Sequence, residues 1–79
     1  MNPAVSVRVL YHHEPDGCWA ESPDIAGWTI AGETFEEVRA LVEDGVAFAL
    51  ASAAEDRGEG FDEDRFADVT VEHYVPAPA

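Results

Sequence analysis

The sequence contains no lysine and only four arginines, against seventeen aspartates and glutamates, so its formal net charge is −13. Binding of DNA or RNA depends on cationic groups that neutralise phosphates. We therefore expect no direct contact with nucleic acid. A basic protein is the favoured partner, because an acidic surface accelerates the encounter with a cationic one.

Cysteine is also scarce, and the single Cys18 excludes an internal disulfide and a zinc site made of cysteines alone. Residues 1–13 lack the basic start and the apolar run of a signal peptide, and no segment approaches the roughly 18 apolar residues of a membrane span. The expected location is the cytoplasm, without membrane attachment. Because a chain of 79 residues builds only a small core, we expect a homo-oligomer, either a dimer or a tetramer.

Apolar and polar residues alternate near both ends of the chain, which predicts strands with one buried face. In the first of these segments Val5, Val7, Val9 and Tyr11 share one side. Turn residues at Asp16-Gly17 and at Pro23 then separate short apolar stretches. Strands are expected at 4–12, 18–22, 28–31 and 68–75, followed by a tail at 76–79.

A capping box predicts a helix after the third strand, with Thr34 as the N-cap and Glu37 three residues later. Gly45 inside this helix would let its backbone approach a sheet closely. The helix is expected to fade near Ala54 and to give way to an acidic flexible loop at 55–67. Its predicted apolar side comprises Phe35, Val38, Leu41, Val42, Gly45, Val46, Phe48, Ala49 and Ser52.

Together these elements predict a single domain over residues 1–79 of the α+β class. Three strands form an antiparallel meander, and a right-handed crossover through the helix makes the fourth strand parallel to the first and adjacent to it. The helix covers one face of the sheet. Leu10 and Tyr74 lie on the uncovered face, and that face or a free edge could pair with another subunit.

The order and spacing of several turn and cap residues resemble those of the HicB-like antitoxin family. The resemblance covers roughly residues 5–50, and the matching positions are Asp16-Gly17, Pro23-Asp24, Gly27, Gly32, Thr34 and Glu37. It implies a partial RNase-H-like fold and a non-enzymatic antitoxin that neutralises HicA, a small basic RNA-cleaving toxin, by covering its active site. Family members often add a DNA-binding domain, but none follows the fourth strand here, so operator binding is not expected. A solitary HicB-like module with another protein partner is the alternative.

Catalytic and metal sites are disfavoured by the residues themselves. The expected first strand carries no Asp or Glu, so a two-metal nuclease site lacks its strand-borne ligand. His12 and His13 point to opposite faces, although one of them could approach His73. In a small metal-binding protein, Cys18 or Glu14 would be the further zinc ligand. Hydrogen-bonded or solvated histidines and a packed Cys18 are the preferred interpretation. We expect no catalytic residues, no metal and no cofactor.

The candidate partner-binding site surrounds Trp19. An exposed tryptophan is a frequent hot spot of binding, and acidic neighbours would suit a cationic partner. Trp28 belongs to the core if it and Ile30 face the helix, and the sequence leaves both tryptophans open between core and interface. The predicted partner-binding residues are Glu14, Asp16, Trp19, Glu21 and Asp24.

Overall fold

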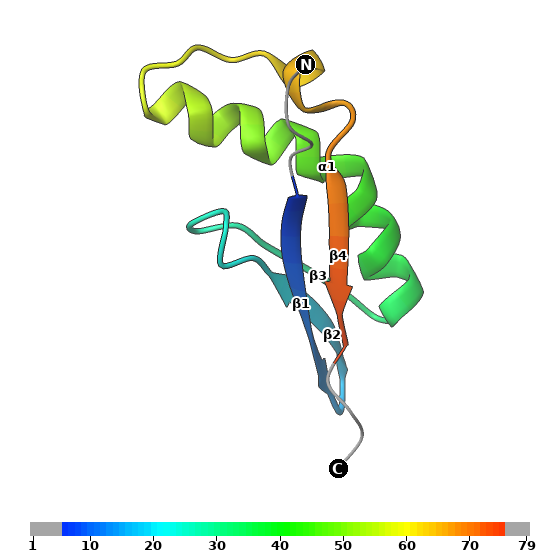
Figure 1. Cartoon of the computed structure of the whole chain (residues 1–79). Coiled ribbons are helices and arrows are strands. Elements are labelled where there is room, and N and C mark those ends of the chain that lie inside the picture. The colour runs from blue at the N-terminus through cyan, green and yellow to red at the C-terminus, as the bar shows by residue number, and fades with distance from the viewer. Residues whose placement is uncertain (1–5, 76–79) are drawn as a thin grey trace.

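The computed structural model describes residues 6–75 and contains one four-stranded sheet and a long helix (Figure 1). The strand order is β3-β2-β1-β4, with β1 and β4 parallel and the other pairs antiparallel. This arrangement confirms the predicted α+β layout and its crossover. The elements are β1 (Ser6–Glu14), β2 (Gly17–Glu21), β3 (Thr29–Gly32), α1 (Phe35–Asp56), the 3₁₀ helix η1 (Glu63–Phe66) and β4 (Thr70–Tyr74).

Element boundaries differ from the prediction by a few residues. β1 runs two residues beyond His12 to Glu14, and β3 begins at Thr29, after Trp28. The predicted start of the first strand at residue 4 and the tail at 76–79 lie outside the described residues. The alternation specified each strand better than its ends, because pairing partners decide where a ladder stops.

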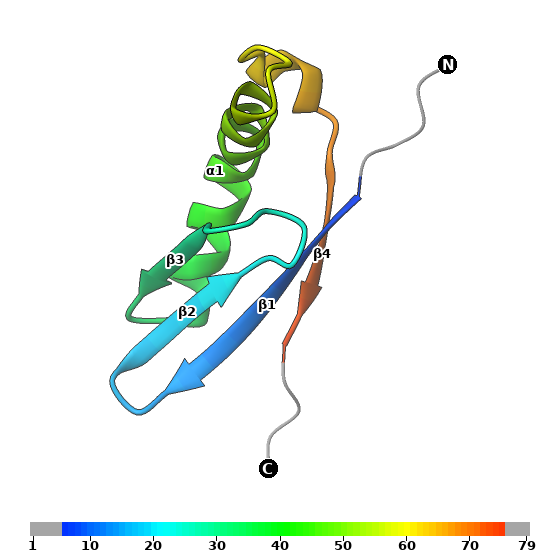
Figure 2. The same ribbon diagram turned by 90° about the vertical axis from the view of Figure 1, so that its left-hand side faces the viewer.

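The helix lies over one face of the sheet (Figure 2). The main core fills the space between them. Trp28 and Ile30 are half-buried and pack against this core. Among residues 6–75, no helix combines the length and the apolar content needed to cross a membrane. The buried residues of the main core are Val7, Val9, Tyr11, Cys18, Ala20, Ile25, Val38, Val42, Val46 and Ala49.

The predicted N-cap is confirmed, with the Oγ1 atom of Thr34 accepting a hydrogen bond of 3.2 Å from the backbone N–H of Glu37. The Glu37 carboxylate reaches back to the backbone N–H of Glu33 at 3.3 Å, one residue earlier than in the usual capping box. The bond to Thr34 satisfies a donor that the first turn leaves without a helical partner, and the bond from Glu33 fixes the residue before the N-cap.

The predicted apolar side of the helix is partly wrong. Leu41 and Phe48 are 43% and 56% exposed, although the predicted apolar side includes both. No atom lies within 4 Å of the position that a Cβ on Gly45 would occupy, so this glycine does not bring the helix close to the sheet. The helix instead buries two adjoining stripes, one against the sheet and one against the segment that follows it, and Leu50 packs against both.

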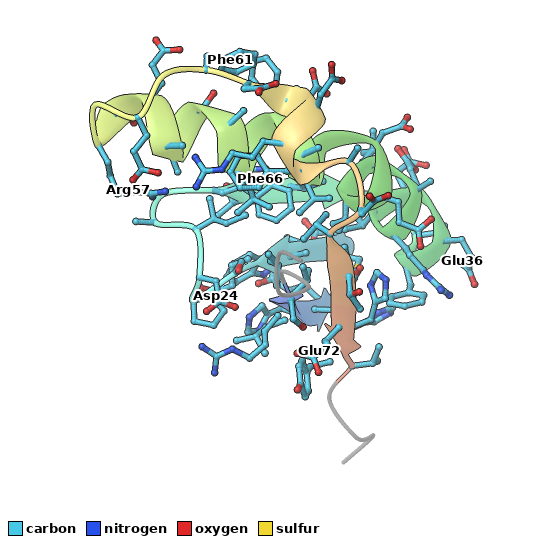
Figure 3. All side chains as sticks on the ribbon, turned by 45° about the horizontal axis from the view of Figure 1, so that its top comes forward. Asp24, Glu36, Arg57, Phe61, Phe66 and Glu72 are labelled. Atoms are coloured by element: carbon cyan, nitrogen blue, oxygen red, sulfur yellow. The ribbon has the colours of Figure 1, made fainter. Side chains whose placement is uncertain are left out.

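The second stripe packs on Phe66, which comes from the segment predicted as an acidic loop (Figure 3). Ala51 and Ala54 contact this ring, which is 7% exposed. The helix continues through Asp56, and η1 forms inside the predicted loop. The interpretation of 55–67 overlooked Phe66 because acidic residues surround both phenylalanines of this segment, and of these only Phe66 is buried.

Candidate partner-binding surface

The face of the sheet away from α1 carries the alternate side chains of its strands, and we call it the open face. Residues paired across neighbouring strands point to the same side. The register pairs His12 with Trp19, and Leu10 with Glu21 on one side and Tyr74 on the other. The open face therefore comprises Ser6, Arg8, Leu10, His12, Glu14, Trp19, Glu21, Thr29, Ala31, Thr70, Glu72 and Tyr74.

Trp19 lies at the centre of a polar cluster on this face. Its indole stacks on the His12 ring, with the ring centroids 4.2 Å apart and the planes inclined by 19°. The indole Nε1–H donates a hydrogen bond of 3.1 Å to Glu14. The ring is half-buried, so one side is already packed and its remaining surface is available for contact.

His12 connects this stack to Glu21. The Nε2 atom of His12 lies 2.7 Å from a Glu21 carboxylate oxygen, and the two side chains are 38% and 41% exposed. Exposed pairs of this kind contribute about 0–1 kcal/mol, because water screens them. A cationic group from a partner can therefore replace the histidine at little cost.

Asp24 is held in a different way, by Arg8. It accepts hydrogen bonds from the Arg8 backbone N–H at 2.9 Å and from two guanidinium nitrogens at 3.2 and 2.9 Å. These bonds lower the pKa of Asp24 from 3.8 to about 2. The contact ties the corner between β2 and β3 onto β1, so the charge of Asp24 is already matched within the chain.

The structure brings four of the five predicted partner-binding residues together. Glu14, Asp16 and Trp19 line one shallow hollow beside the β1–β2 turn, and Glu21 joins them through His12. Asp24 lies at the other end of β2 with Arg8. Sequence reasoning missed His12 and Arg8 as members of this surface, although the alternation already placed both on the same side of β1.

The other chemically suggestive residues lie on the covered side. Cys18 is buried, and burial raises the pKa of its thiol, which disfavours a reactive thiolate. His73 registers with Val9 and hydrogen-bonds the Tyr11 hydroxyl through Nδ1, so it does not meet His12 or His13. Within residues 6–75, no three His, Cys, Asp or Glu side chains are grouped so that they could hold a metal ion.

The Tyr11–His73 pair continues to Glu43, whose carboxylate lies 3.6 Å from the His73 Nε2 atom. Burial is the main cause that raises the pKa of Tyr11 and lowers the pKa of His73. Both groups are therefore favoured in their neutral forms, with the phenol as donor and the imidazole as acceptor. This pairing satisfies polar groups beneath the helix.

The open face thus combines aromatic rings, which are frequent binding hot spots, with carboxylates, which would complement a cationic partner. Comparison of the chain with models of protein families, with curated proteins and with solved structures finds no match. The functional conclusion therefore depends on the residues of the open face and on their charges.

Proposed function

We propose that this chain is a HicB-like antitoxin, or an interaction module derived from one, that neutralises a basic RNA-cleaving HicA-type toxin by binding it. The supporting observation is the cluster of Trp19 with Glu14 and Glu21 on the open face, and with Asp16 in the adjoining turn, in a chain whose net charge is −13. Under this proposal the chain acts in the cytoplasm, as a binding protein and not as an enzyme.

Electrostatics supplies the first step of the proposed binding. A toxin that cleaves RNA presents cationic groups to phosphates, and carboxylates on the open face can occupy the same positions. Long-range attraction between an acidic and a basic chain raises the association rate and weakens with added salt. Arginines of the toxin would compete with His12 for Glu21, since this pair is solvent-exposed.

Contact with Trp19 supplies the second step, which is slow release. Aromatic anchors at the centre of an interface contribute most of the binding energy, and they do so mainly through the dissociation rate. The stack on His12 and the hydrogen bond to Glu14 hold the indole in place before the partner arrives. Such preorganisation reduces the entropy lost on binding.

The experiment is co-purification, in low salt, with the product of the neighbouring gene, which this proposal expects to be a small basic protein, followed by an assay of RNA cleavage. We expect a complex that inhibits cleavage and weakens as salt increases. Trp19→Ala should lower the affinity by about 30-fold, the effect of a hot-spot truncation. The matched control is Phe48→Ala, which truncates an exposed aromatic ring on the helix and should leave the affinity unchanged.

Circular dichroism of both variants checks that each remains folded. A folded Trp19→Ala protein that inhibits as well as the parent chain would move the binding site away from the open face. Failure of the parent chain to bind the basic neighbour would reject the antitoxin proposal, and would favour a solitary HicB-like oligomer with another protein partner.

A further inference from the structure

The two edges of the sheet differ in how well they are protected against pairing. β3 is four residues long, ends at Gly32 and leads directly into the helix. β4 is five residues long, contains no proline or glycine, and carries Glu72 as its only carboxylate. Short length, charged side chains and a covering element each protect an edge strand from pairing with another chain. β3 is protected by its shortness and by its direct connection to the helix, whereas β4 has only the charge of Glu72. β4, at the outer edge in Figure 2, is therefore the more receptive edge.

A groove runs between β4 and α1 on the helix side of this edge. Its apolar wall includes Val46, Val69 and Val71, of which the last two are only half-buried. The main core is thus left incompletely covered on the β4 side. A second chain that pairs with β4 would bury these valines further.

The charges of the groove distinguish between possible occupants. Its ionisable residues are Arg39, Glu43 and His73, and the first two lie 3.4 Å apart as an opposite pair. Burial lowers the pKa of His73 and favours the neutral imidazole. The groove is thus close to neutral in a chain of net charge −13. Two such chains repel least where both surfaces are neutral, whereas a basic partner gains no net attraction there.

We propose that two copies of this chain associate by antiparallel pairing of their β4 strands, which joins two four-stranded sheets into one continuous sheet. The inferred twofold axis passes by Val71. It places Val71 opposite Val71 of the second copy, and Thr70 opposite Glu72 of the second copy. An axis at Glu72 would set two carboxylates face to face, and an axis at His73 would oppose two imidazoles that already bind Tyr11.

Charge substitutions at Thr70 test both the interface and its register. Thr70→Lys places a cation opposite Glu72 of the second copy at two symmetric positions, and should tighten the dimer about fivefold. Thr70→Asp places like charges there and should weaken the dimer by about the same factor. The measurement is the dimer dissociation constant by sedimentation equilibrium of the full chain at fixed salt.

Thr29 offers a matched control, because it is an exposed threonine on the opposite edge strand. Thr29→Lys and Thr29→Asp change the net charge by the same amounts as the Thr70 substitutions. Each should shift the dissociation constant only slightly. If the Thr29 pair shifts it as much as the Thr70 pair, the effect is overall charge and the β4 interface is rejected. A chain that stays monomeric at every accessible concentration also rejects it.

Amide hydrogen exchange locates the interface independently. Protection of the Thr70–Tyr74 amides should increase with chain concentration, while that of Thr29–Gly32 should not. Concentration-dependent protection at β3, or protection of β4 only after addition of the basic neighbour, would overturn the homodimer. This inference does not depend on the proposed function, and toxin binding can fail while β4 pairing stands.

Discussion

The two faces of the sheet are built from the same strands but serve different purposes. On the helix side, Val7, Val9 and Tyr11 are at most 2% exposed and belong to the main core. Between them on the same strand, Arg8 is exposed and Leu10 is half-buried on the open face. The covered face therefore supplies stability, and the open face can hold binding residues because the fold does not need them buried.

Histidines show the same contrast between the faces. The His73 side chain is 18% exposed and hydrogen-bonds Tyr11 beneath the helix, whereas the His12 side chain is 38% exposed and pairs with Glu21. A polar group in the core must be satisfied within the protein, because losing its partner costs the full desolvation penalty. On the open face water can replace the partner, and so can another protein.

Truncation at two adjacent residues of β1 gives the largest expected difference between the faces. Val9→Ala removes a side chain that is 0% exposed, and should lower the free energy of unfolding by about 2 kcal/mol through lost burial and a cavity. Leu10→Ala, on the half-buried open face, should cost about 1 kcal/mol or less. Urea unfolding at one chain concentration measures both. Equal losses would show that something covers the open face in solution.

Removal of one hydroxyl from each tyrosine gives the next largest difference. Tyr11→Phe leaves the His73 Nδ1 atom without its partner and should lower the free energy of unfolding by about 1–2 kcal/mol. Tyr74→Phe, at a side chain 47% exposed on the open face, should change it by less than about 0.5 kcal/mol. Thermal unfolding of both variants checks the order, which would be contradicted if Tyr74→Phe cost more.

The smallest effects concern how the free energy of unfolding depends on pH. His73 and Asp24 should contribute to it in different pH ranges. The pKa of His73 is lowered from 6.5 in the folded chain, so the unfolded chain binds more protons and stability falls as the pH drops below about 6.5. The pKa of Asp24 falls from 3.8 to about 2, so its contribution is present above 3.8 and is lost as the pH falls towards 2.

Urea unfolding across the pH range separates these two contributions. His73→Gln should flatten the decline near neutral pH, while His13→Gln, at an exposed histidine, should leave it in place. Asp24→Asn should flatten only the decline in the free energy of unfolding at acidic pH, below about 3.8. If His13→Gln removed the near-neutral decline, the Tyr11–His73 pair would not be its source.

Most of the fold was accessible from local patterns. Alternation predicted the strands, Thr34 and Glu37 predicted the start of the helix, and the handedness of crossovers placed the fourth strand beside the first. The orientation of the helix was only partly predictable. Its apolar residues cover more than one side, so the pattern did not predict which of them would be buried. In the structure Phe66 packs against one stripe of the helix, while Leu41 and Phe48 are exposed.

The candidate site was predictable in composition but not in pairing. The sequence predicted acidic neighbours for Trp19, and in the structure Glu14, Asp16 and Glu21 lie near it. The sequence did not predict that His12 would stack on the indole, because that contact depends on the register between two strands. Turn geometry sets such a register, and a slip of one residue would turn every side chain of the strand to the other face of the sheet.

By itself, the sequence determined the charge of the protein, the alternation of its strands and the start of its helix, because these properties depend on residue identity and on contacts a few positions apart. Only the tertiary structure decided which carboxylates are matched, which aromatic rings stay exposed and which edge of the sheet is open. Those outcomes depend on distances between residues far apart in the chain, and such distances are fixed only when the sheet, the helix and η1 pack against one another.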